Sequence, residues 1–215
     1  MSHVGNTYRI ARTLVRHELL LLASLLRWVA RRPHGTGAGA GRVYGYTRGQ
    51  GAMMFGFGFV CVIETVTMSV LLRDFPLVHQ AVLVLDLYTI LVVAGLHAAS
   101  VTRPHVLTDT TLRLRRFATV DLCVPIAAVA SVRRELRTTH EKRDGELDMP
   151  VGSQTTITLE LAEPVAYSTL FGRRRVVRLV RFHADESHQL VGVIREFTRD
   201  RQERTGPSPL PARPA

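Results

Sequence analysis

Two long apolar runs, separated by a four-residue turn, dominate the middle of the chain. They cover residues 52–72 and 77–99, and each is as long as the roughly 20 residues that a helix needs to cross a bilayer. Pro76 ends the turn between them and stops a helix that approaches it. The pattern therefore predicts a helical hairpin, 52–99, that crosses a membrane twice. Two buried helices of a soluble bundle are the alternative, but neither run has a polar face for water.

An amphipathic helix is predicted before the hairpin, within residues 1–32. Its uninterrupted apolar stretch, 19–26, is too short to span a bilayer. At about 100° per residue, a leucine-rich face that Glu18 interrupts lies opposite an arginine face. The arginines are Arg9, Arg12, Arg16, Arg27 and Arg31. Such a helix suits a membrane surface and contact with anionic lipid, while packing on a cytoplasmic domain or on another copy stays open.

The predicted N-terminal helix resembles a signal peptide in its basic start and apolar centre. It lacks a small-residue cleavage site, and arginines follow at once, so we reject that interpretation. Residues 33–51 are rich in glycine and are predicted to form a flexible connector to the hairpin.

The hydrophobic period changes from helical to alternating after residue 100. Leu112 and Leu114 alternate with arginines, which is typical of a half-buried strand. Seven short strands are predicted, near 105–108, 112–115, 120–124, 131–137, 156–161, 165–170 and 174–183. The segment 138–153 is predicted to be a loop, and Glu163-Pro164 a turn. A helix over 185–200 follows, and the proline-rich residues 201–215 are predicted to be disordered.

Seven strands closed by one helix is the element order of a pleckstrin-homology-like domain. The chain resembles bacterial membrane proteins that carry a two-helix hairpin followed by such a domain, a group that is mostly uncharacterised. The resemblance covers about residues 52–200 and rests on short motifs: 103–108 leading into 112–115, then 124–126, 159–164 and Gly172 before the last helix. It implies a membrane α+β protein whose domain 104–200 is a seven-stranded partial β-barrel with a C-terminal helix, acting as a scaffold or interaction module.

Charge sets the expected orientation. The chain has a net charge of +10 and a pI near 10.8, although 46% of its residues are hydrophobic. Residues 1–51 carry eight arginines and one acid, Glu18. Because arginine-rich flanks stay in the cytoplasm, both termini are expected there, with only the turn around Asp74 outside. The positive charge is then a topology signal and an attraction to anionic lipid, and nucleic acid is not needed to explain it.

Two acids in the predicted spans are the sharpest candidate site. Glu64 and Asp86 each lie eleven residues from Phe75, in the turn, and thus roughly 16 Å deep in a hairpin. An ionised acid at that depth is costly, so we expect at least one to be protonated and hydrogen-bonded, either to the other acid or to Thr65, Thr67 or Tyr88. They form either a proton or cation site or a polar contact between helices or copies.

A second candidate is the arginine-rich segment Arg173, Arg174 and Arg175, beside the predicted hairpin glycine. It either contacts anionic lipid headgroups or protects a solvated strand edge. We find no motif for an enzyme, a metal site or a cofactor, and the two cysteines give no disulfide framework. The expected function is that of a membrane-anchored interaction protein at the inner face of the cell membrane, which self-associates or recruits a membrane protein partner. The alternatives are a small oligomer that handles protons or ions through Glu64 and Asp86, and an anionic-lipid sensor.

Overall fold

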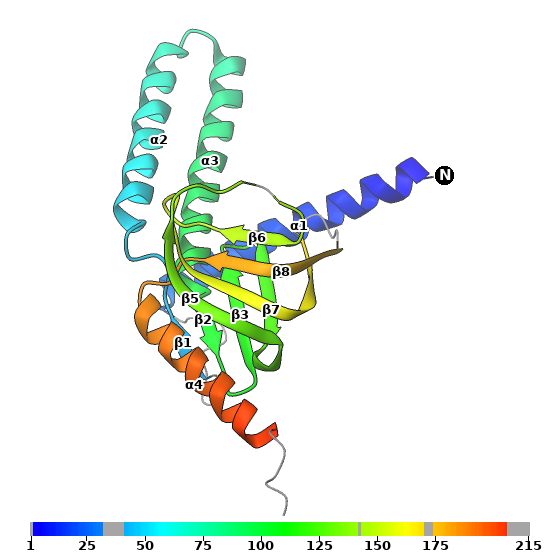
Figure 1. Cartoon of the computed structure of the whole chain (residues 1–215). Helices are drawn as coiled ribbons and strands as arrows, with labels where there is room; N and C mark the ends of the chain where they lie inside the picture. The colour runs from blue at the N-terminus through cyan, green and yellow to red at the C-terminus, as the bar shows by residue number, and fades with distance from the viewer. Residues whose placement is uncertain (1, 32–40, 142, 170–173, 206–215) are drawn as a thin grey trace, which may run out of the picture.

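Two antiparallel helices form a hairpin that projects from the rest of the molecule (Figure 1). The computed structural model describes residues 2–31, 41–141, 143–169 and 174–205. The hairpin consists of α2 (Gly51–Leu71) and α3 (Pro76–Thr102), which pack against each other. Pro76 lies in the first turn of α3, where its missing N–H removes no helical hydrogen bond. Both helices are long and apolar enough to cross a membrane, as the apolar runs predict.

A β domain of two four-stranded sheets lies at the base of the hairpin. The first sheet contains, in spatial order, β1 (Arg42–Tyr44), β2 (His105–Leu107), β3 (Thr111–Arg116) and β4 (Val120–Pro125). The second contains β5 (Val129–Arg137), β7 (Thr155–Ser168), β8 (Arg174–Phe182) and β6 (Glu146–Met149). A 3-10 turn (Ile126–Ala128) joins the sheets, and α4 (Ser187–Thr205) follows β8. The α+β class predicted from the sequence is confirmed.

The alternating apolar positions of the strands point into one core between the sheets. Its members include Leu112, Leu114, Leu122, Val124, Ile157, Leu159, Val180 and Phe182. Leu190 and Ile194 of α4 are fully buried against the same core, so the helix covers its open side. Alternation is thus the pattern that places these side chains, because successive residues of a strand point to opposite faces.

Two details of the strands differ from the sequence-based expectation. The predicted loop 138–153 contains β6, which pairs in parallel with β8 at the edge of the second sheet. The predicted turn at Glu163-Pro164 is instead part of one long strand, β7. Proline is tolerated there because the pairing of β7 with β8 is interrupted between Glu160 and Val165, where no ladder hydrogen bond is required of it. The described strands between 104 and 200 still number seven.

The hairpin is inserted within the β domain rather than placed before it. β1 precedes α2 in the chain, yet it pairs with β2, which follows α3, with Tyr44 opposite His105. Gly41 precedes β1 with a φ of 77°, and a Cβ there would collide with the carbonyl group of Leu107. Residues 41–50 of the predicted connector therefore belong to the β domain, whereas 32–40 lie outside the described residues.

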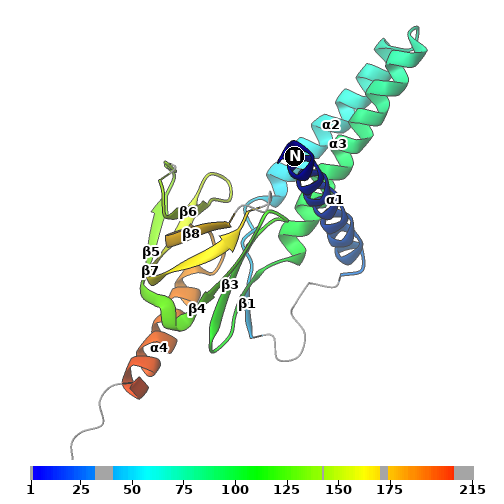
Figure 2. The ribbon, with the colours of Figure 1, turned by 90° about the vertical axis from the view of Figure 1, so that its right-hand side faces the viewer.

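α1 (Ser2–Val29) crosses the base of the hairpin at a steep angle, as both ribbon views show (Figures 1 and 2). It packs on α3 rather than on α2. At the other end of the chain, α4 extends to Thr205, five residues into the segment predicted to be disordered. Residues 206–215 lie outside the described residues.

Candidate functional site

The contact face between α2 and α3 carries several polar side chains. Near the tip, Ser69 Oγ and His79 Nε2 are 2.8 Å apart. In an antiparallel pair this contact sets the register, so Asp86, seven residues further along α3, lies at the level of Val62. Asp86 is half-buried, and its Oδ2 atom is buried without a hydrogen-bond partner among the described residues.

Glu64 has a different environment from Asp86. Its side chain is exposed on the surface of α2, and no hydrogen bond or ion pair joins it to another described residue. The hydroxyl groups of Thr65 and Thr67 donate to carbonyl oxygens of their own helix, those of Cys61 and Ile63, at 2.9 and 2.8 Å. The structure therefore does not bring Glu64, Asp86, Thr65 and Thr67 into one hydrogen-bonded group.

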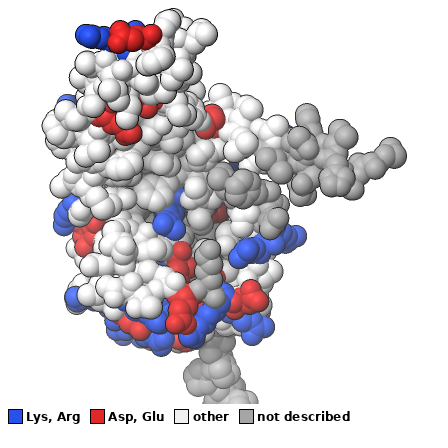
Figure 3. Space-filling model, turned by 90° about the horizontal axis from the view of Figure 1, so that it is seen from above, with Lys and Arg blue, Asp and Glu red and all other residues white. Residues whose placement is uncertain are grey.

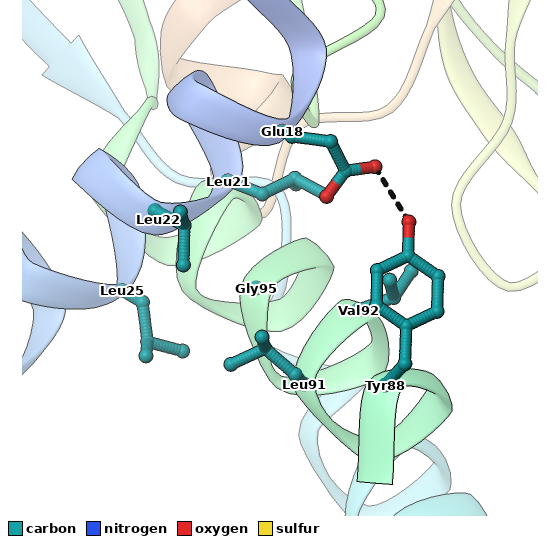
Figure 4. Close-up of a pocket in the computed structure, with 8 residues that line it drawn as sticks. All are labelled: Glu18, Leu21, Leu22, Leu25, Tyr88, Leu91, Val92 and Gly95. Carbon is teal, nitrogen blue, oxygen red and sulfur yellow. Dashed lines mark hydrogen bonds between the residues drawn. The ribbon is translucent and has the colours of Figure 1, made fainter. Parts of the chain in front are cut away.

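Tyr88 joins a group that the sequence did not predict. Its hydroxyl donates to Glu18 Oε1 of α1 at 2.8 Å (Figure 4). The two side chains border a cleft of about 160 Å³ between α1 and α3. The rest of the lining is apolar: Leu21, Leu22, Leu25, Leu91, Val92 and Gly95. Glu18 was visible in the sequence as the one acid that interrupts the leucine-rich face of α1, but its partner could not be identified from helical periodicity.

α1 lies tightly against α3 at Gly95. A Cβ at this position would lie 3.1 Å from Leu21 Cβ, so a larger residue would push the helices apart. Leu21 and Ser24 are buried here, and Trp28 packs edge-on against His97 with ring centroids 5.5 Å apart. Glycine permits this crossing because it removes the side chain from the contact.

The remaining surface of α1 has two distinct sides. Leu22 and Glu18 line the same cleft as Tyr88, on the side of the hairpin tip. Leu20 packs against the cluster that contains Ala118, on the side of the β domain. Helical periodicity places an exposed apolar stripe on the tip side, formed by Val15, Leu19, Leu22, Leu26 and Val29. The arginine face follows on the β-domain side, with Arg12, Arg16 and Arg31 exposed and Arg27 half-buried. The side chain of Arg9 lies outside the description.

The arginine-rich segment begins β8. Arg174 and Arg175 are exposed, and Arg173 lies outside the described residues. β6 pairs with β8 only from Leu179 onwards, so this part of β8 is bonded on one side by β7 and forms a local sheet edge. The predicted choice between lipid contact and edge protection stays open.

Both ends of the hairpin are attached to the β domain by polar contacts. Just before α2, the backbone N–H groups of Thr47 and Arg48 each donate to the carboxylate of Asp185 at 3.1 Å. Just after α3, Arg103 donates to Asp121 Oδ2 at 3.1 Å. These contacts give the hairpin two anchored ends and limit its motion relative to the sheets.

A buried aromatic group lies beneath these anchors. The ring of Tyr46 stacks on His105 at 4.9 Å, and its hydroxyl oxygen accepts the N–H of Phe117 at 3.0 Å. Burial raises the pKa of Tyr46 to about 12 and lowers that of His105 to about 4. His105 is neutral at physiological pH, and its Nε2 donates to His183 O at 3.0 Å while its Nδ1 accepts the N–H of Arg115 at 3.2 Å.

The described residues contain no cluster of three histidine, cysteine or acidic side chains that could hold a metal ion. No protein-family model, curated protein or solved structure matches this chain.

Proposed function

We propose that this chain is a membrane-anchored interaction protein whose hairpin spans the bilayer and holds the β domain at its cytoplasmic face. The observation that carries the proposal is the apolar surface of the hairpin. Only 6% of the most apolar window of α2 and 11% of that of α3 is buried, so these are not core helices of this fold. Phe55 is 78% exposed and Leu77 is 82% exposed. Exposure of so large an apolar surface to water would be unfavourable, whereas the acyl chains of a bilayer would cover it.

The distribution of charge supports the same arrangement. From above, the surface of the hairpin is mostly uncharged below its tip, while basic and acidic side chains gather over the β domain (Figure 3). β1 and β2 are paired, so the chain enters and leaves the hairpin on one side. With the arginine-rich flanks in the cytoplasm, both ends of the described chain lie there and the turn at Asp74 lies outside.

α1 supports an additional contact with the cytoplasmic leaflet. It crosses the hairpin steeply in both ribbon views (Figures 1 and 2). Helical periodicity places its apolar stripe on the side of the tip and its arginines on the side of the β domain. In a bilayer that the hairpin crosses, the apolar stripe would enter the acyl region and the arginines would lie among anionic headgroups. This arrangement is the basis for lipid sensing as a secondary role.

The relationship to pleckstrin-homology-like domains is part of the proposal. Two packed sheets followed by a helix on the open side agree with that architecture, and a domain of this kind at a membrane would serve to bind a partner or another copy. The ion-handling alternative has one observation in its favour, the buried and unpaired Oδ2 of Asp86. We favour the interaction role because Glu64 faces outward and Asp86 faces the other helix.

Cysteine labelling tests the membrane arrangement with the chain's own residues. Cys123 is exposed in the β domain and Cys61 is buried in the hairpin. In intact cells, an impermeant maleimide should label an Asp74→Cys variant that lacks both native cysteines, and should label Cys123 only after permeabilisation. Cys61 should remain unlabelled in both conditions. Labelling of Cys123 in intact cells, or recovery of the chain in the soluble fraction, would show the proposal to be wrong.

A further inference from the structure

We propose that α2 pairs with α2 of a second copy of this chain, along an exposed stripe centred on Glu64. The inference rests on the proposed function, because it requires the hairpin to lie in a bilayer. It identifies the partner that the hairpin itself recognises, whatever the β domain binds.

The stripe follows α2 at alternating spacings of four and three residues, the spacing along which two helices wind around each other. Its members are all exposed: Met53, Phe57, Val60, Glu64, Thr67 and Leu71. Glu64 and Thr67 are the exposed polar residues of α2 between 52 and 71, and both belong to this stripe. Cys61, next to Val60 in sequence, is buried and thus lies outside it.

The chemistry of Glu64 requires a partner. Among the described residues it has no hydrogen bond or ion pair, yet it lies eleven residues from the turn, near the middle of a bilayer that the hairpin spans. The neutral carboxyl group carries one donor and one acceptor, so two carboxyl groups can satisfy each other. Lipid chains offer neither.

Symmetry favours a second copy as the source of the matching group. Two copies inserted with the same topology are related by an axis along the membrane normal, so each residue lies at the same depth in both. Glu64 of one copy therefore lies level with Glu64 of the other, and the flanking apolar residues of the stripe meet their own counterparts. Asp86 does not compete, because it faces α2 within its own hairpin.

Oxidative cross-linking in native membranes tests the stripe. In a chain carrying Cys61→Ser and Cys123→Ser, we expect Val60→Cys and Thr67→Cys each to form disulfide-linked dimers of this chain. The matched control retains native Cys61 and carries only Cys123→Ser, and it should stay monomeric because Cys61 is buried. Absence of dimers at 60 and 67, dimers at Cys61, or cross-links only to a protein of different mass would overturn the proposal.

Replacement of the acid tests its role. In the Val60→Cys chain, Glu64→Gln retains a donor and an acceptor and should leave the dimer fraction within about twofold, whereas Glu64→Leu should weaken self-association about fivefold. Glu18→Leu is the control, since that acid is bonded to Tyr88 within its own chain. Equal dimerisation of Glu64→Leu would refute the carboxyl pairing. If labelling places residue 74 outside while residues 60 and 67 give no dimer, this inference fails and the proposed membrane arrangement stands.

Discussion

His105 shows how a single buried residue links the hairpin attachment to the stability of the domain. Its ring is enclosed by Tyr46, which precedes the hairpin, and by Phe182 of β8. Both ring nitrogens are hydrogen-bonded to backbone groups, and the nearby ionisable groups are His183, Asp185 and Arg115. Protonation would remove the acceptor at Nδ1 and place a charge at a fully buried position.

We expect the stability of the β domain to fall between pH 6.5 and about 4. The unfolded histidine has a pKa of 6.5 and burial lowers that of folded His105 to about 4, so the full stability is present above pH 6.5 and is lost as the unfolded chain takes up the proton. The loss amounts to roughly 3 kcal/mol over this window. Hydrogen exchange of the β3 amides in the full chain, measured against pH, would detect it.

The control for this effect is a pair of glutamine variants. His105→Gln keeps a donor and an acceptor but does not titrate, so the pH dependence should become shallower. Burial also lowers the pKa of His183, which leaves a residual slope of the same sign. His188→Gln, at an exposed position, should change nothing. An unchanged slope in His105→Gln would contradict the assignment.

At the scale of the elements, the packing of α1 on α3 depends on Gly95. Leu21 approaches Gly95 so closely that any added Cβ would meet it at 3.1 Å, and Ser24 is fully buried at the same crossing. The helix is otherwise held by the Glu18–Tyr88 hydrogen bond and by Trp28 against His97. Its arginines make little contribution to the packing, since three of the four described ones are exposed.

We predict that Gly95→Leu releases α1 from α3. Trp28 is the sole tryptophan of the chain, so its fluorescence reports the crossing directly. Loss of the contact with His97 should shift its emission maximum and increase its quenching by a water-soluble quencher. Gly58→Leu in α2 is the matched control, because a Cβ there meets nothing within 4 Å. An unchanged spectrum in Gly95→Leu would show that the crossing tolerates a larger residue.

At the scale of the whole molecule, the hairpin is an insertion between two paired strands. β1 before it and β2 after it are paired. The segment that links β1 to the hairpin is hydrogen-bonded to the domain through Tyr46 and Asp185. A movement of one hairpin end would therefore be transmitted to the sheet rather than absorbed by a linker. The hairpin and the β domain are therefore mechanically coupled through this strand pair.

The insertion predicts where the domain can be cut. A chain that joins residues 41–50 through a short glycine-serine linker to 103–205 should fold without the hairpin, since both strands of the pair are retained. A chain of 104–205 alone should have a free energy of unfolding about 1–3 kcal/mol lower than the linked chain. It leaves the N–H of Phe117 without the Tyr46 hydroxyl and exposes the edge of β2. Urea unfolding of the two chains compares them directly, and equal midpoints would contradict the role of β1.

Particular residues show how far the sequence could be interpreted. The apolar runs and the alternation at Leu112 and Leu114 depend on period alone, and they correctly predicted the two hairpin helices and strand β3. β6 was missed because Glu146 and Asp148, which bond Arg181, look like loop residues until their partner is known. Thr65 and Thr67 were grouped with Glu64 by proximity, but their hydroxyl groups are satisfied within their own helix.

The sequence by itself determined the two apolar helices, the amphipathic α1, the charge asymmetry and the strand faces, because each follows from a local period or from composition. Only the tertiary structure decided that β1 pairs across the hairpin, that Glu18 bonds Tyr88 and that Glu64 faces outward while Asp86 faces α2. These are contacts between residues far apart in the chain or rotations of one helix against another. A periodicity specifies which face of an element is apolar, but only packing specifies which element that face meets.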